Sequence, residues 1–115
     1  MKQCLMALAI TLVAAPAWAH DAATGAQITA AISGNTVQGS MNESGAYTEF
    51  YDADGTIKGV DYTGTWSVEG DQMCFAYGEE PSCWDVHIED DQVMWIKDGA
   101  EDGTGTLVSG NPNNF

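Results

Sequence analysis

Short runs of alternating apolar and polar residues dominate the chain from residue 35 onward. The runs are rich in Val, Ile, Thr, Tyr, Phe and Trp, and turn residues such as Gly, Asn and Asp separate them, as expected for antiparallel strands. This pattern predicts a mainly β fold, an antiparallel meander of about seven or eight short strands that forms a curled sheet or a small barrel. The expected strands cover residues 35–41, 46–53, 56–61, 62–69, 72–77, 83–88, 92–97 and 104–109.

Glycines within and between these runs determine the expected turns. Asp54-Gly55 predicts a type I′ hairpin turn, because Gly accepts a positive φ and Asp tolerates one. The stretch 56–69 contains Gly59 and Gly64, so it is either two strands or one long strand bent at the glycines. We expect the acidic segment Asp98–Gly103 to be a turn before the last strand.

A short helix precedes the strands. Thr24 and Gln27 have the spacing of a capping box, in which each side chain satisfies a backbone group of the first turn. Ile28 and Ile32 follow at helical spacing, and Gly34 stands where a left-handed C-cap belongs. These signals predict a helix over about 25–33, which must dock its Ile28/Ile32 stripe on the sheet because so short a helix is unstable alone.

Residues 1–19 have the features of an export signal. Lys2 is followed by an apolar stretch and by the small-residue cleavage site Ala17-Trp18-Ala19. We therefore expect cleavage after Ala19, a single small β domain over 20–115, and a periplasmic or secreted location. No other stretch is apolar enough to predict a membrane helix, so no membrane partner is expected after cleavage.

Two cysteines remain beyond the expected signal, Cys74 and Cys83. In an oxidising compartment such a pair predicts a structural disulfide across a β-hairpin. If the two lie opposite each other, Met73 faces Trp84, and Phe75 faces Ser82. The period of two then predicts an apolar face and an opposite, wetter face. The expected apolar face holds Met73, Phe75, Trp84, Val86 and Ile88, and the wetter one holds Cys74, Cys83, Asp85 and His87.

The charge is strongly unbalanced, with seventeen carboxylates against three lysines and a net charge of −14. This balance argues against nucleic acid, anionic lipid or phosphorylated ligands, which would find little counter-charge. The acidic residues either solvate the surface or bind a cation.

Two sets of residues are candidate metal ligands. Asp98, Glu101 and Asp102 are the candidate calcium ligands of the acidic turns. Cleavage after Ala19 would leave His20 as the N-terminal residue, whose amine and ring nitrogen, together with His87, form a candidate copper site. Asp52–Thr56 has a Ca²⁺-loop-like start, but Ile57 stands where an EF-hand needs Gly, which favours a hairpin turn.

The chain also resembles a group of small exported alphaproteobacterial proteins of unknown function, and the resemblance implies no activity. A weaker, fold-level similarity to lipocalin-type barrels rests on Gly64-Thr65-Trp66, a G-x-W motif that lies here in the middle of the chain. The segments that carry the first resemblance are Ser33–Val37, Phe50–Thr56, Gly64–Val68, Met73–Phe75, Cys83–Val86 and Gly110–Pro112.

These observations favour a non-enzymatic exported β domain, without a cofactor, that either binds a small apolar ligand or serves as a structural or interaction module. Trp66, Trp84 and Trp95 are the candidate ligand-binding residues, although core packing of tryptophan is common. A metal-binding protein is the alternative, and a small hydrolase with paired carboxylates is a third hypothesis.

Overall fold

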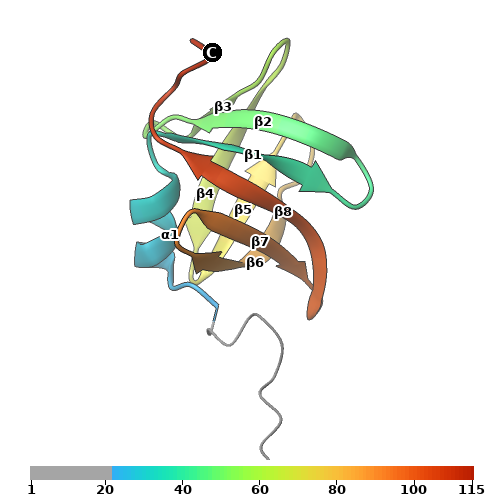
Figure 1. Ribbon diagram of the computed structural model, residues 1–115. Coiled ribbons are helices and arrows are strands. Elements are labelled where there is room, and N and C mark those ends of the chain that lie inside the picture. Colours follow the sequence, from blue (N-terminus) through green and yellow to red (C-terminus); the bar gives the residue numbers. More distant parts are fainter. Residues whose placement is uncertain (1–21) are drawn as a thin grey trace, which may run out of the picture.

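The computed structural model describes residues 22–115 as a closed antiparallel β-barrel in which the strands follow one another in sequence order (Figure 1). The first strand, β1, pairs with the last, β8, and so closes the barrel. The predicted mainly β fold is therefore confirmed, in its barrel form. The expected export signal and His20 lie outside the described residues. The strands are β1 Asn35–Met41, β2 Gly45–Tyr51, β3 Thr56–Lys58, β4 Thr63–Glu69, β5 Gln72–Ala76, β6 Ser82–Glu89, β7 Gln92–Lys97 and β8 Ala100–Val108.

β3 is much shorter than its neighbours. It pairs with β2 only at Phe50 and Tyr51, and residues 59–62 form a turn into β4. The alternative of one long bent strand over 56–69 is therefore wrong. In this turn the Tyr62 ring packs directly against the backbone of Gly59. The ring occupies the position that a Cβ at residue 59 would take, so only glycine allows this contact.

The helix α1, Gly25–Ile32, packs against β1, β4 and β5 at one end of the barrel, on the opposite side from the β1–β2 turn (Figure 1). The predicted capping box is present, since Gln27 N–H donates to Thr24 Oγ1 (3.2 Å) and Thr24 N–H donates to Gln27 Oε1 (2.9 Å). Gly34 has the expected positive φ of 77°. Ile28 and Ile32 are fully buried, so α1 closes what we call the helix end of the barrel.

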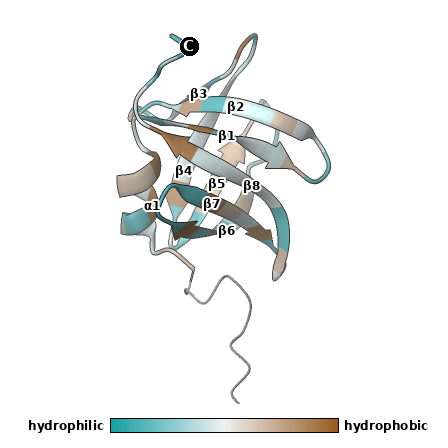
Figure 2. Cartoon of the chain, viewed as in Figure 1, coloured by the Kyte–Doolittle hydropathy of each residue, from teal (hydrophilic) through white to brown (hydrophobic). Residues whose placement is uncertain are grey.

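Alternate residues of every strand fill the interior, as the period of two requires. At the helix end these are aliphatic residues, which pack with α1, and Figure 2 shows hydrophobic segments on α1 and on the strand end beside it. The fully buried side chains there include Val37, Ile57, Met73, Val86 and Val93.

The predicted disulfide between Cys74 and Cys83 is present and joins directly opposed residues of β5 and β6. Met73 lies opposite Trp84, and Phe75 opposite Ser82, as expected from that pairing. The expectation of a wetter outer face is wrong for Cys74, which is only 3% exposed. The disulfide therefore lies in a partly protected position on the outside of the barrel.

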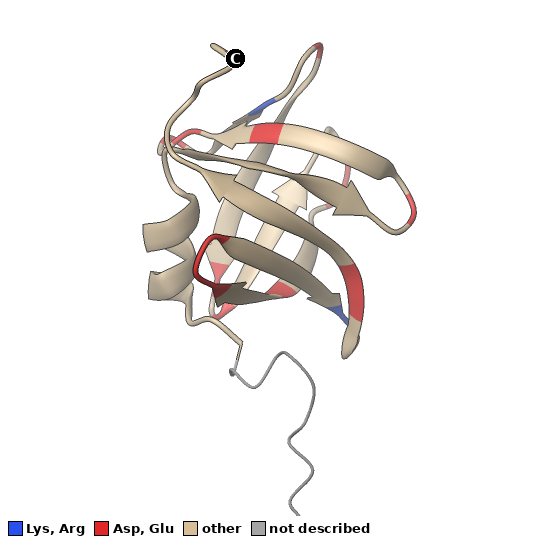
Figure 3. Cartoon of the chain, in the orientation of Figure 1, with Lys and Arg blue, Asp and Glu red and all other residues tan. Residues whose placement is uncertain are grey.

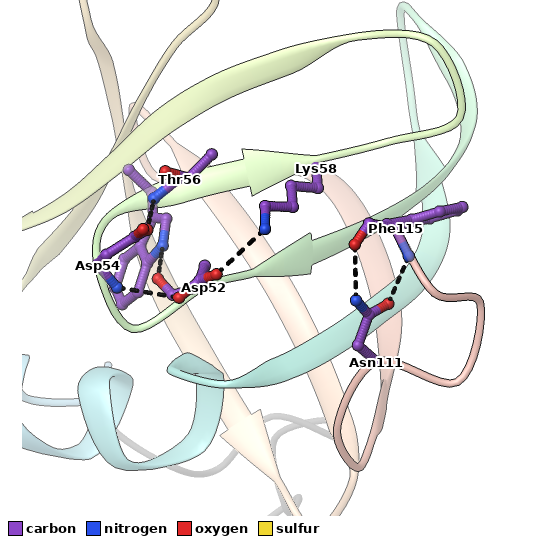
Figure 4. A network of polar contacts seen from close by, with 7 residues as sticks. Asp52, Asp54, Thr56, Lys58, Asn111 and Phe115 are labelled. Carbon is purple, nitrogen blue, oxygen red and sulfur yellow. Dashed lines mark hydrogen bonds and ion pairs between the residues drawn. The ribbon is translucent and has the colours of Figure 1, made fainter.

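Two Asp-Gly turns differ from the sequence expectation. At Asp54-Gly55 only Gly55 has a positive φ, so the predicted type I′ turn is wrong there. Asp54 instead accepts a hydrogen bond from Thr56 N–H at 2.9 Å, within the network drawn in Figure 4, where Lys58 also binds Asp52 (3.3 Å). These side-chain hydrogen bonds make a longer loop with a single left-handed glycine more favourable.

The second difference lies between β7 and β8. Asp98 and Gly99 both have positive φ, 51° and 79°, and form a two-residue turn of the kind found in tight hairpins. β8 consequently begins at Ala100, and the expectation of an acidic turn over 98–103 is wrong beyond Gly99. A register shift follows, in which Ile96 faces Glu101 while Trp95 faces Gly103. Asp102 is the extra residue of this bulge.

The C-terminal segment is tied back to the barrel. Gly110 N–H donates to Asn35 Oδ1 (3.0 Å), and Thr36 Oγ1 donates to the Gly110 carbonyl (2.7 Å). Asn111 then exchanges two hydrogen bonds with the backbone of Phe115 (Figure 4). The chain therefore ends beside the start of β1, at the helix end.

Candidate functional site

An aromatic cavity of about 410 Å³ lies within the barrel at the end away from α1. Its walls come from the strand ends that face away from the helix, including the β1–β2 turn and the bulge of β8. We call this the cavity end. The aromatic residues that line it are Tyr47, Tyr51, Tyr62, Phe75, Tyr77, Trp84 and Trp95. All four tyrosines of the chain are among them.

A buried carboxylate, Glu49, lies among these aromatic rings. Its side chain is only 5% exposed and points inward from β2, between Tyr47 and Tyr51 on the same strand face. Tyr51 donates a hydrogen bond to Oε1 (2.8 Å) and Tyr62 donates one to Oε2 (2.7 Å). The Tyr77 hydroxyl lies within hydrogen-bonding distance of both oxygens, at 3.0 and 2.9 Å. Three phenols thus surround one carboxylate.

The phenols are held in their protonated form. Burial, and secondly the negative charge of Glu49, raises the pKa of Tyr51 and of Tyr77 well above the ordinary value. The pKa of Tyr62 is raised by burial and by its hydrogen bond to Glu49. Burial also raises the pKa of Tyr47 to about 12. Around neutral pH these tyrosines are therefore hydrogen-bond donors.

Tyr47 connects the cavity to the core. Its hydroxyl accepts a hydrogen bond from Trp95 Nε1 (2.8 Å) and donates one to the Thr104 carbonyl (3.1 Å). The ring reaches this position because Gly105 has no side chain, since a Cβ there would come within 2.5 Å of the Tyr47 hydroxyl and of a Val37 methyl. A glycine of β8 therefore helps to position a wall of the cavity.

Phe75 is the centre of the aromatic packing. Its ring centroid lies 5.2 Å from that of Trp95, nearly perpendicular to it, and 5.3 Å from that of Trp84. Such tilted and edge-to-face contacts are favourable and keep rings in defined positions. The cavity walls are therefore ordered by packing as well as by hydrogen bonds.

Asp102 contributes a second carboxylate to the cavity lining. It accepts a hydrogen bond from Trp84 Nε1 at 2.9 Å. The β8 bulge accounts for this position, because an extra residue re-aims the side chains near it. Exposed Glu43, in the β1–β2 turn, is a third carboxylate of the lining.

The structure brings two of the three predicted ligand-binding tryptophans to the cavity, Trp84 and Trp95. Trp95 is 1% exposed and also belongs to the core, whereas Trp84 is partly exposed. Trp66 lies elsewhere, with its Nε1 donating to the Asp52 carbonyl (2.9 Å) and its ring against that of Tyr51.

Sequence reasoning missed Glu49 and the tyrosines around it. One signal for them exists in the chain, the alternation Tyr47-Thr-Glu49-Phe-Tyr51, which places a carboxylate between two phenols on one strand face. Tyr62 and Tyr77 lie beyond the ends of their strands, and only the closed barrel brings them to Glu49.

The candidate metal ligands that lie within residues 22–115 are not gathered together. His87 lies on the outer face of β6 opposite Met94, Asp98 is in the β7–β8 turn, and Asp102 binds Trp84. Glu101 is exposed at the start of β8. Within residues 22–115, no group of three or more His, Cys, Asp or Glu side chains is placed to hold a metal ion.

No protein-family model, no curated protein and no solved structure matches this chain. The resemblance to small exported proteins therefore stays a prediction. Across the described range no helix is long and apolar enough to cross a membrane.

Proposed function

We propose that this protein is an exported β-barrel that binds a small, largely apolar ligand in the aromatic cavity. The observation that carries the proposal is the cavity itself, about 410 Å³ and lined by seven aromatic residues. This volume lies within the range of small-molecule sites, which combine apolar walls with a few placed polar groups. Here Glu49, its phenols and Asp102 are those polar groups.

Export is the second part of the proposal. The features of residues 1–19 support it, and the disulfide between Cys74 and Cys83 is compatible with an oxidising compartment. The location that we propose is periplasmic or secreted.

Binding is tested by titrating the purified protein with the neutral fluorescent dye N-phenyl-1-naphthylamine, whose emission rises in an apolar site. We expect saturable binding to one site. Met41→Trp should lower the affinity for the dye by about tenfold or more, because Met41 lines the cavity from the inward face of β1 and a larger side chain there occupies its space.

Ala53→Trp is the control for the introduced indole, because Ala53 is exposed and lies in the β2–β3 turn at the helix end. It should leave the affinity unchanged. The absence of saturable dye binding by the folded wild-type protein would overturn the proposed function, as would equal effects of the two substitutions.

A further inference from the structure

The charge inside the cavity has one sign. Among the described residues, those that line the cavity include three carboxylates, Glu43, Glu49 and Asp102, but no lysine, arginine or histidine. Lys58 binds Asp52 instead, and Lys97, which does not line the cavity, donates to the Cys83 carbonyl (2.8 Å) and lies against the Trp84 ring. Figure 3 shows the acidic residues spread over many turns of the barrel, so the surrounding surface does not oppose this sign. An anionic ligand would therefore be repelled and a cationic one attracted.

Most of the hydrogen-bonding capacity of Glu49 is already used. A carboxylate has about four lone-pair positions, and the three phenol protons of Tyr51, Tyr62 and Tyr77 point at its two oxygens, that of Tyr77 being shared between both. An incoming N–H or O–H donor would find at most one free position unless it displaced a phenol. The carboxylate, by contrast, has no cationic side chain beside it in the lining. The site thus favours positive charge more than a further hydrogen-bond donor.

The aromatic walls of the cavity also favour a positively charged ligand. Aromatic ring faces attract organic cations, and recognition of quaternary ammonium by several rings together is a known use of this interaction. One wall already shows it, since Lys97 Nζ lies 4.7 Å from the ring centroid of Trp84. A methylated ammonium group also loses little hydration when it enters an apolar cavity, because it has no N–H to desolvate.

We propose that the ligand of this cavity carries a quaternary ammonium group, which lies among the aromatic rings close to Glu49. This inference rests on the proposed function and defines the ligand class. Three features support it together: a buried carboxylate without a basic neighbour in the lining, phenols that occupy most of its acceptor positions, and aromatic walls. The cavity has room for an apolar substituent on the ammonium group.

Three matched probes test the inference by isothermal titration at constant ionic strength: choline, its uncharged isostere 3,3-dimethylbutan-1-ol, and 2-aminoethanol. We expect choline to bind at least about tenfold more tightly than either of the others, because the isostere has no charge and the primary amine loses its hydration. A roughly tenfold ratio of affinities is the size expected when cation–π attraction by the rings acts together with the charge of Glu49. This comparison uses the wild-type protein and does not depend on a variant that folds.

Glu49→Gln should lower the affinity for choline several-fold and that for 3,3-dimethylbutan-1-ol much less, because the rings remain while the charge is lost. Glu69→Gln is the matched control, because it removes the same charge from an exposed site at the helix end of β4. It should leave the choline affinity within about twofold of wild type. Asp102→Asn provides a second test at the cavity lining and should weaken choline binding less than Glu49→Gln.

The possible results are distinct. Equal affinity for choline and its isostere, tighter binding of 2-aminoethanol, or equal effects of the Glu49 and Glu69 substitutions would overturn the inference. Binding of N-phenyl-1-naphthylamine without any binding of choline would also overturn it, but would leave the proposed function in place. If neither the dye nor choline binds, the proposed function fails together with the inference.

Discussion

At the residue scale, the contact of Glu49 with three tyrosines determines how the phenols ionise. The pKa of every tyrosine is raised, that of Tyr47 to about 12 from an ordinary value of 10.0. We therefore predict that ultraviolet titration of the folded protein shows no phenol ionising around pH 10. In denaturant, which serves as the control, all four should titrate normally. A normal titration of two or more phenols in the folded protein would contradict the described cavity.

The same shifts predict a loss of stability in alkali. A group whose pKa is higher in the folded state stabilises the fold fully below its unfolded pKa, and this contribution disappears as the pH rises through the folded value. The free energy of unfolding should thus be nearly constant from neutral pH to about pH 9 and fall steadily between about pH 10 and 12. Denaturant unfolding at a series of pH values measures this, and a flat profile over that interval would disagree with burial of the phenols.

Trp95 and Trp84 are expected to differ although both line the cavity. Trp95→Ala should lower the free energy of unfolding by about 3–5 kcal/mol, because Trp95 is fully buried, packs on Phe75 and donates to Tyr47. Trp84→Ala should cost clearly less, since Trp84 is partly exposed and part of its ring faces the cavity. Denaturant titration of both variants measures the two losses of unfolding free energy. A larger loss for Trp84→Ala than for Trp95→Ala would contradict the position of Trp95 in the core.

At the scale of elements, the interior glycines of β8 are as important as its side chains. Gly105→Ala should destabilise the barrel by about 1–3 kcal/mol, because the new methyl group overlaps the Tyr47 hydroxyl and Val37. Thr106→Ala, at the neighbouring outward position, is the control and should change the stability by less than about 0.5 kcal/mol. Equal effects of the two would show that the interior beside Tyr47 can expand at no cost.

The elements themselves were largely predictable, because their signals are local. The capping box of Thr24 and Gln27, the left-handed Gly34 and the Cys74–Cys83 pairing all act over short distances in the sequence. The predictions of turns and strand ends were wrong where two local signals competed for the same residues. Asp98-Gly99 closes a tight turn, so that residues expected in a loop join β8, and the resulting bulge brings Asp102 to the cavity. Composition alone gives no means to foresee a register shift.

The cavity was less predictable for a related reason. Trp84 and Trp95 were found because large aromatic residues are general candidates for binding. Glu49 was not found, because a glutamate in a strand is usually an exposed residue. Its burial depends on Tyr62 and Tyr77, which are distant in sequence and reach it only through barrel closure. When the hydrogen-bond partners of a polar group lie far away in the sequence, the residues next to that group do not indicate that it is buried.

At the scale of the whole molecule, the disulfide joins two strands that both supply cavity walls. Replacing Cys74 and Cys83 by Ala together should lower the free energy of unfolding by about 2–3 kcal/mol, because the unfolded chain loses a short covalent loop. The mass of protein exported in cells should equal that of residues 20–115 less two hydrogens. Free thiols in such material, isolated without reductant, would contradict both the pairing and the proposed route of export.

The short strand β3 has a consequence for motion. β1 has a strand partner on both sides over most of its length, whereas β2 meets β3 only at Phe50 and Tyr51. Within the described chain, Gly45–Glu49 therefore have a strand ladder on one side alone. Amide hydrogens on their other side should exchange with solvent through small local openings, while those of β1 exchange only when the whole barrel unfolds. The wall that carries Glu49 should thus open more readily than β1, and under the proposed function it is a route by which a ligand would enter.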